Sequence, residues 1–237
     1  TKEDFSKAIS KQFSGLKVSE NDDNEVVIKG KEKFNIEKPN EWSEEVLLQF
    51  AHDLRHKSKP MIIAANKIDR PNSNDNLKIL KNAYPKIIII PCSADSELAL
   101  RNASKSKVID YIPGDQKFSI NISLNEKQKS ALESVKNIVL ETYGSTGVQE
   151  VLNNVVFSLL NYIAIFPASA HKLTDSKGNV LPDCFLLKNG STALDFAFSI
   201  HTDLGNNFVK AINALTKKAV GKDHVLKHRD ALEIITR

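Results

Sequence analysis

The sequence predicts an α/β unit followed by an α+β unit, and three patterns support this order. Two short apolar runs, residues 61–65 and 87–91, enclose a segment with helical spacing, which predicts a strand, a helix and a second strand. Residues 125–160 carry apolar side chains at the spacing of two packed helices. From Asn161 onward, short strand-like runs surround one helix, which is typical of a ubiquitin-like β-grasp.

The composition is that of an ordinary globular protein. The 237 residues are 41% hydrophobic and 26% charged, with a net charge of +4, which allows more than one domain with a buried core. That charge permits contact with nucleic acid without requiring it. No apolar run has the length of a membrane span, and the N-terminal residues do not form a secretory signal. Cys92 and Cys184 are far apart and not in metal-binding spacing, so we expect a reducing, cytoplasmic location.

The pattern of apolar residues in the range 1–58 predicts two helices separated by a polar segment. Residues 42–55 have one apolar face, and Ser43 is the expected N-cap. His52 and His56 are spaced to chelate a metal on this helix, but no third ligand is evident, so a solvated surface is the favoured interpretation. The first helix is marked by an apolar stripe of Ala8, Ile9, Phe13 and Leu16.

Polar residues follow both predicted strands of the α/β unit. The apolar run Met61–Ala65 is typical of a strand buried on both faces of a parallel sheet. It is followed by Asn66-Lys67-Ile68-Asp69. A helix is expected from Asn76 to Ala83, and the second strand ends in Cys92-Ser93-Ala94. Ligands of open α/β sheets bind beyond the carboxyl ends of the strands, so these two polar ends are the expected binding site.

The chemistry of these ends matches guanine. The Asp69 carboxylate could accept both the N1–H and the exocyclic amino group of guanine, whereas adenine would leave it unpaired at a considerable free-energy cost. Asn66 can bridge the base to neighbouring loops, and the Lys67 stem can lie along a base face. The backbone N–H groups of Ser93 and Ala94 could meet guanine O6. An ordinary exposed loop also uses Asn, Lys and Asp, but the occurrence of both stretches in this order favours base recognition.

A phosphate-binding loop is not found in the sequence. The pattern G-x-x-x-x-G-K-[ST] is absent, Val220–Asp223 lacks the upstream glycine, and Gly144–Gly147 lacks the lysine. No Asp-x-x-Gly that could hold magnesium precedes Pro60. We therefore expect the chain to be the C-terminal part of a longer protein whose phosphate-binding half lies upstream of Thr1, and we assign no catalytic residue here.

The last part of the chain predicts strands around one capped helix. Ser191 is the expected cap of a helix at 192–200, with Leu194 and Phe198 on its buried face. His201 and Asp203 have no nucleophile nearby, so we expect them to hold a turn rather than to act as an acid–base pair. The strand candidates are 162–166, 180–187, 208–215, 219–220 and 232–235.

These motifs together resemble a known family. The base-recognition residues Asn66–Asp69 and Ser93-Ala94 are joined by Tyr111–Asp115, Tyr143–Gln149 and the tail segments 178–192, 197–205 and 220–226. In this order they resemble the Obg/YchF-related GTPases with a C-terminal TGS domain, especially the archaeal-type branch. The resemblance implies a partial P-loop GTPase-like domain with a helical insertion, followed by the β-grasp TGS domain.

The domain limits expected from this resemblance are residues 1–58 for part of the helical insertion, 59–160 for the C-terminal half of the G domain, and 161–237 for the TGS domain. The resemblance implies GTP or GDP as ligand, and GTP hydrolysis with Mg²⁺ that is held only through the upstream half. YchF proteins proper end the base motif in glutamate and favour ATP, so Asp69 predicts a preference for guanine. This chain alone should bind nucleotide weakly and should not hydrolyse it.

For the TGS-like part, the resemblance implies contact with RNA, the ribosome or a protein partner; neither a membrane nor DNA is expected. Cations there could contact phosphates, but aspartates are interspersed among them, so a mixed solvated surface remains an equal alternative. These cations are Lys210, Lys217, Lys218, Lys222, Lys227 and Arg229.

Two other functional classes stay open. The chain could be a non-enzymatic adaptor in which a degenerate G-like domain supports an RNA- or protein-binding β-grasp module. It could also belong to another TGS-bearing protein, such as a synthetase or a stringent-response enzyme, but that hypothesis does not explain Asn66–Asp69 followed by Ser93-Ala94.

Overall fold

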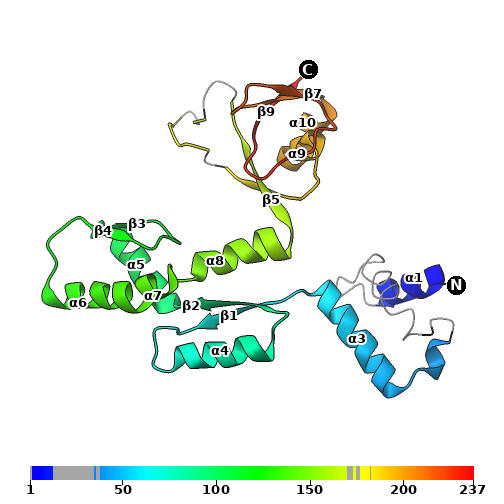
Figure 1. Cartoon of the computed structure of the whole chain (residues 1–237). Helices are drawn as coiled ribbons and strands as arrows, with labels where there is room; N and C mark the ends of the chain where they lie inside the picture. The colour runs from blue at the N-terminus through cyan, green and yellow to red at the C-terminus, as the bar shows by residue number, and fades with distance from the viewer. Residues whose placement is uncertain (1, 13–34, 36–37, 170–172, 175–176, 182) are drawn as a thin grey trace. The chain divides into compact units, whose positions relative to one another are not determined.

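A computed structural model describes residues 2–12, 35, 38–169, 173–174, 177–181 and 183–237 (Figure 1). It divides into two compact units, one of residues 1–63 with 78–89 and one of residues 64–77 with 90–237. Each unit is described by itself below.

The first unit contains α1 (Lys2–Gln12), a short 3₁₀ helix η2 (Pro39–Glu41) and α3 (Glu44–Ser58). The predicted cap of α3 is confirmed, because the Ser43 hydroxyl accepts a hydrogen bond from the backbone N–H of Val46 at 3.4 Å. Phe50 and Leu54 are buried on the predicted apolar face. Phe13 and Leu16, part of the stripe expected on the first helix, lie outside the described residues.

The predicted strand–helix–strand segment is confirmed. Strands β1 (Ile62–Asn66) and β2 (Ile88–Cys92) pair in a two-stranded sheet, with α4 (Ser73–Ala83) between them in the chain. The expectation that the first strand is buried on both faces is wrong, because Ala64 and Asn66 are exposed. Full burial requires neighbouring strands on both sides and helices on both faces, whereas the described sheet has two strands.

In the second unit, helix α5 (Ala94–Lys105) packs beside a hairpin of β3 (Ile109–Tyr111) and β4 (Phe118–Ile120), in which Tyr111 faces Phe118. This hairpin was not predicted from the sequence. Gly114 has φ of +95° in the turn, a conformation that lets the chain reverse there. The buried core of this part comprises Leu100, Ile109, Tyr111, Leu132 and Leu140.

The two predicted packed helices are present. The first runs from α6 (Glu126–Ser134) through a π-helical segment η3 (Val135–Leu140) to α7 (Glu141–Tyr143). Asn125 caps it, since its side chain and that of Gln128 each accept from the other's backbone N–H. The second runs from α8 (Val148–Asn153) into another π-helical segment, η4 (Asn154–Leu159).

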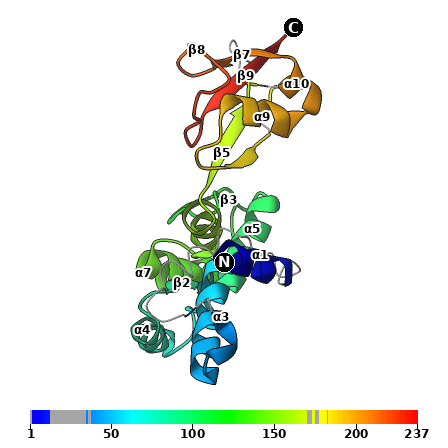
Figure 2. The ribbon, with the colours of Figure 1, turned by 90° about the vertical axis from the view of Figure 1, so that its right-hand side faces the viewer.

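The C-terminal part forms the expected β-grasp. Its five-stranded sheet has the order β6-β5-β9-β7-β8, with β5 and β9 parallel and the other pairs antiparallel. Figures 1 and 2 show α9 and α10 beside this sheet. The elements are β5 (Tyr162–Pro167), β6 (Phe185–Lys188), α9 (Ala193–Ile200), α10 (Thr202–Asn206), β7 (Phe208–Asn213), β8 (Ala219–Val220) and β9 (Ala231–Thr236).

Details of helix α9 differ from the prediction. Thr192, not Ser191, is the N-cap, because its hydroxyl accepts from the Asp195 N–H while Asp195 accepts from the Thr192 N–H. The buried face consists of Ala193, Phe196 and Ala197, whereas Phe198 is 44% exposed. The helix carries apolar side chains on both faces, so apolar spacing alone does not identify the buried one.

Two further expectations concern the ends of elements. The strand expected from residue 180 begins only at Phe185, and Val180 makes an isolated bridge with Thr174. The expected turn role of His201 is confirmed: its Nδ1 accepts from the Asp203 N–H at 3.2 Å and caps α10.

Candidate functional site

Asn66 joins the two loops that follow β1 and β2. Its side-chain oxygen accepts from the backbone N–H of Ala94 at 3.0 Å and from that of Lys67 at 2.8 Å. The backbone N–H of Ile68 also donates to the carbonyl of Cys92 at 3.3 Å. The two polar strand ends predicted from the sequence therefore lie together.

Asp69 and Ser93 form the second link between these loops. The Ser93 hydroxyl donates to one Asp69 carboxylate oxygen at 2.7 Å, and the other oxygen lies 3.4 Å from Nε of Arg70. The Asp69 side chain remains 25% exposed. A carboxylate has about four acceptor sites, so Asp69 keeps capacity for further donors.

Ser93 and Ala94 occupy the start of α5. Ser93 is fully buried, and its hydroxyl caps the helix by accepting from the Ser96 N–H at 3.3 Å. Both backbone donors that we expected to meet a guanine O6 are already used: the Ser93 N–H donates to Thr146 and the Ala94 N–H donates to Asn66. A ligand oxygen at Ala94 would therefore share or replace the Asn66 carboxamide.

Lys67 lies exposed in a left-handed turn with φ of +70°. A non-glycine residue in this conformation carries strain, and such residues concentrate at functional loops. The turn directs the Asn66 carboxamide toward the Lys67 N–H, and the Ser73 hydroxyl further fixes the loop by donating to the Ile68 carbonyl at 2.7 Å.

A buried polar cluster behind Ser93 was not found from the sequence. Glu97, with a side chain 5% exposed, accepts from the hydroxyl of Thr146 at 2.5 Å, the hydroxyl of Tyr111 at 2.8 Å and Nε of Arg101 at 2.6 Å. Burial raises the pKa of Glu97, but these three hydrogen bonds and the charge of Arg101 outweigh it and hold the pKa below its ordinary value. Burial and the bond to Glu97 raise the pKa of Tyr111.

The loop Gly144–Gly147 lies against the end of β2. Gly147 has φ of +79°, and a Cβ placed there would overlap the Pro91 carbonyl and come within 2.9 Å of the Cα of Cys92. Only glycine allows the backbone at position 147 to lie this close to the backbone of Pro91 and Cys92. The sequence signal of this loop was the pair of glycines before a helix, which also belongs to the motif Tyr143–Gln149 that carries the family resemblance.

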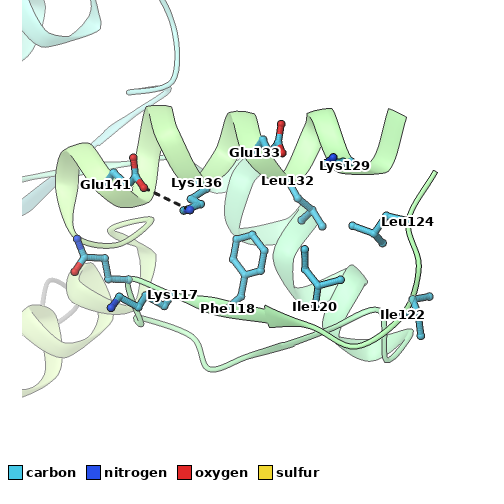
Figure 3. A pocket seen from close by; sticks show the side chains of 11 residues that line it. Lys117, Phe118, Ile120, Ile122, Leu124, Lys129, Leu132, Glu133, Lys136 and Glu141 are labelled. Atoms are coloured by element: carbon cyan, nitrogen blue, oxygen red, sulfur yellow. Dashed lines mark ion pairs between the residues drawn. The ribbon is translucent and has the colours of Figure 1, made fainter. Parts of the chain in front are cut away.

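Of the hollows on the surface of the described residues, one lies at Asp69 and a larger one lies elsewhere. The first, of about 250 Å³, is lined by Asp69, Asp95, Ser96 and residues of α6 and η3, but not by Asn66, Lys67, Ser93 or Ala94. The larger groove, of about 780 Å³, lies between β4 and α6 (Figure 3). Phe118 and Ile120 point from β4 toward Leu132, and the Lys136–Glu141 ion pair of 3.7 Å crosses one end.

Other candidate groups show no sign of a site. His52 and His56 are exposed, with their Nε2 atoms 3.2 Å apart. Among the residues that the structure describes, no three His, Cys, Asp or Glu side chains gather to hold a metal ion. Within the part of the chain that the structure describes, no helix combines the length and the apolarity needed to cross a membrane.

Cys92 is buried and Cys184 is exposed, and both are free thiols.

Two family models cover most of the chain. A model described as Obg-like GTPase YGR210-like, G4 motif-containing domain, matches residues 64–169, and a TGS domain model matches residues 174–236. The chain therefore carries a G4 motif-containing domain of the YGR210-like Obg-like GTPase type, followed by a TGS domain. The first match begins within β1 and includes both base-motif candidates, and the second includes most of the five-stranded sheet.

Similar proteins agree with these two matches. A crystal structure of a GTP-binding protein from Pyrococcus horikoshii is 43% identical, with a TM-score of 0.69 over 98% of this chain and 61% of that chain. The uncharacterized GTP-binding protein MJ1332 of Methanocaldococcus jannaschii is 43% identical over 97% of this chain. An uncharacterized GTP-binding protein of Schizosaccharomyces pombe is 31% identical over 64% of it. The chain spans 57% and 39% of the lengths of these two relatives.

Proposed function

We propose that this chain supplies the base-recognition half of a guanine-nucleotide site, formed by Asn66, Lys67, Asp69, Ser93 and Ala94. The proposal is carried by the cross-linking of the two loops: Ser93 to Asp69 at 2.7 Å and Ala94 to Asn66 at 3.0 Å. The relatives' description as GTP-binding proteins supports the same ligand.

Each residue has a distinct role in this proposal. The Asp69 carboxylate accepts the N1–H and the amino group of guanine, while Ser93 fixes the direction of that carboxylate. Asn66 and the Ala94 N–H meet the other edge of the base, and the Lys67 stem covers one base face. Adenine offers Asp69 no matching pair of donors, so its binding would leave a desolvated carboxylate unpaired.

Calorimetric titration of the full-length protein with GDP and ADP tests this proposal. We expect GDP to bind much more tightly than ADP, and Asp69→Asn to weaken GDP binding by about a hundredfold or more, because two charge-assisted hydrogen bonds are lost. Asp110→Asn is the matched control, since Asp110 is an exposed carboxylate bonded to Asn121 in the β3–β4 hairpin. Equal affinity for the two nucleotides, or unchanged GDP binding by Asp69→Asn, would contradict the proposal.

For the whole protein we propose GTP hydrolysis in the cytoplasm, with the division into an insertion, a G domain and a TGS domain at residues 58/59 and 160/161. Among the described residues, no three His, Cys, Asp or Glu side chains gather to hold a metal ion. A nucleotide-bound Mg²⁺ needs only one or two protein carboxylates beside phosphate oxygens and water, and we propose that the upstream half of the protein supplies them. No hydrolytic step is therefore assigned to a residue of this chain.

We propose that the TGS domain contacts RNA, including ribosomal RNA, through exposed lysines. Lys217 is a poor candidate because its ammonium donates to the Ala214 carbonyl at 2.6 Å within the β7–β8 turn. Lys218 and Lys222 are exposed on either side of β8 and are better tests. Reversing both charges should make the slope of log K against log[salt] for ribosome binding shallower by about two. Lys86→Glu, outside the domain, is the control; an unchanged salt slope would favour a protein partner.

A further inference from the structure

The Gly144–Gly147 loop is joined to the base-recognition loop by a backbone hydrogen bond. The Ser93 N–H donates to the Thr146 carbonyl at 2.9 Å, and both residues are fully buried. The same Ser93 carries the hydroxyl that holds Asp69. Any displacement of Thr146 is therefore transmitted to the residue that orients the candidate base-reading carboxylate.

Thr146 is itself held by a buried charge. Its hydroxyl donates to the Glu97 carboxylate, and Tyr111 donates to the same oxygen. The other oxygen accepts from Arg101, which is half exposed and bridges the cluster to solvent. A buried carboxylate with three donors gives strong, directional hydrogen bonds, and removal of one donor leaves part of the charge uncompensated.

The cluster joins three segments that are distant in sequence. Glu97 lies on the first turns of α5, Tyr111 ends β3, and Thr146 belongs to the loop between α7 and α8. The Tyr111 hydroxyl also accepts from the Gly114 N–H at 3.4 Å, which ties the β3–β4 turn to the same cluster. Ser93 immediately precedes α5, so the loop is fixed both through its own helix and through the Thr146 carbonyl.

We infer that Thr146, Glu97 and Tyr111 form a positioning network that fixes the Ser93–Ala94 loop in the geometry needed to receive a guanine base. None of the three touches the base: they act through the Thr146 carbonyl and helix α5. Binding sites require their contacting groups to be held by a supporting shell to within about half an ångström. The consequence for nucleotide affinity rests on the proposed function, whereas the fixing of the loop does not.

Amide hydrogen exchange of Ser93 and Ala94 measures the positioning directly. We expect Thr146→Val, which keeps the side-chain shape but removes the hydroxyl, to speed exchange at these two amides by about tenfold or more, as expected for loss of a charge-assisted hydrogen bond. Thr146→Ser, which keeps the hydroxyl, should restore protection. Thr142→Val is the matched control. The Thr142 hydroxyl donates to the Asn137 carbonyl at an exposed position of the helix that precedes the Gly144–Gly147 loop.

A general loss of stability would speed exchange everywhere, so amides of β9 serve as the internal reference. If Thr146→Val does not fold, Tyr111→Phe removes a second donor from the same oxygen of Glu97 and provides the same readout. Unchanged exchange at Ser93 and Ala94 in the folded variant, or acceleration equal to that in β9, would overturn the positioning role.

Titration of the full-length variants with GDP separates this inference from the proposed function. If the wild-type protein binds GDP, Thr146→Val should weaken it about tenfold and Thr146→Ser should restore it. If the wild-type protein does not bind GDP but exchange at Ser93 still accelerates in Thr146→Val, the positioning network stands and the base-recognition proposal fails. If GDP binding is normal in a variant whose Ser93 exchange has accelerated, the network does not position the base site.

Discussion

The Ser93 hydroxyl lies 2.7 Å from a carboxylate oxygen of Asp69 and is also the N-cap of α5. One side chain thus fixes both the carboxylate proposed to read guanine and the start of the helix that follows. The helix and the site cannot be changed independently at this residue.

Ser93→Ala should therefore lower both stability and GDP affinity. We expect a loss of about 1 kcal/mol in the free energy of unfolding from the lost cap. We also expect about tenfold weaker GDP binding, because Asp69 loses a charge-assisted donor. Ser43→Ala is the control: it removes the cap of α3 without touching Asp69, so it should lower stability alone. GDP binding by Ser93→Ala equal to that by Ser43→Ala would contradict the role assigned to Ser93.

Substitution of two glycines in one loop separates backbone strain from steric overlap. Both Gly144 and Gly147 have positive φ, but a Cβ at Gly144 meets open space while one at Gly147 overlaps the backbone of Pro91 and Cys92. Gly144→Ala should cost about 1 kcal/mol of unfolding free energy. Gly147→Ala should cost clearly more, because the end of β2 must move. Urea denaturation compares them, and equal losses would show that the close approach is unimportant.

The charge of Glu97 predicts a pH dependence of stability. Its folded-state pKa is below the ordinary value of 4.5, so the ionised form is favoured by folding. This stabilisation is fully present above the unfolded-state pKa and is lost as the pH falls through the lower folded-state value. Urea midpoints measured from about pH 6 to about pH 3 should fall for the wild-type protein. Glu97→Gln should be less stable near neutrality and show a flatter decline; parallel curves would contradict the prediction.

Two phenylalanines on α9 test which face of the helix is buried. Phe196 is fully buried and lies edge-on to Phe185 with ring centroids 5.8 Å apart, whereas Phe198 is 44% exposed. Phe196→Ala should lower the free energy of unfolding by about 3–5 kcal/mol, as for other core phenylalanines. Phe198→Ala should cost less, although its ring packs against Gly205. Calorimetric scans of both variants provide the comparison, and a larger loss for Phe198→Ala would favour the face expected from the sequence.

The sequence predicted those elements whose local pattern and tertiary packing agree. Regular apolar spacing marks the strand–helix–strand segment and the two helices between Asn125 and Leu160, and these elements are present. The predicted Ser43 cap of α3 is present as well. The β3–β4 hairpin was missed because three-residue strands are too short to show alternation. The buried face of α9 was misassigned because this short helix carries apolar side chains on both faces, so apolar spacing alone does not identify the face that packs on the sheet.

The candidate site could be predicted as a set of residues but not as a network. The link between Asn66 and Ala94 follows from the meeting of strand ends at one edge of a sheet, which is a general rule. The support from Thr146 and Glu97 depends on contacts between segments distant in sequence, and a buried glutamate on an amphipathic helix looks in sequence like a solvated one. The carbonyl of Thr146 also takes the Ser93 donor that we had expected to be available for the base.

The close approach of Gly147 to Cys92 has a practical consequence for chemical labelling. Cys184 is exposed and Cys92 is buried beneath that loop, so a thiol reagent should modify Cys184 first. Burial raises the pKa of the Cys92 thiol, which further lowers its reactivity at neutral pH. Once Cys184 is replaced by serine, the remaining modification rate reports how often the end of β2 separates from its covering loop. A nucleotide that stabilises the Ser93–Ala94 loop would then be detected as slower labelling of a residue that it never contacts.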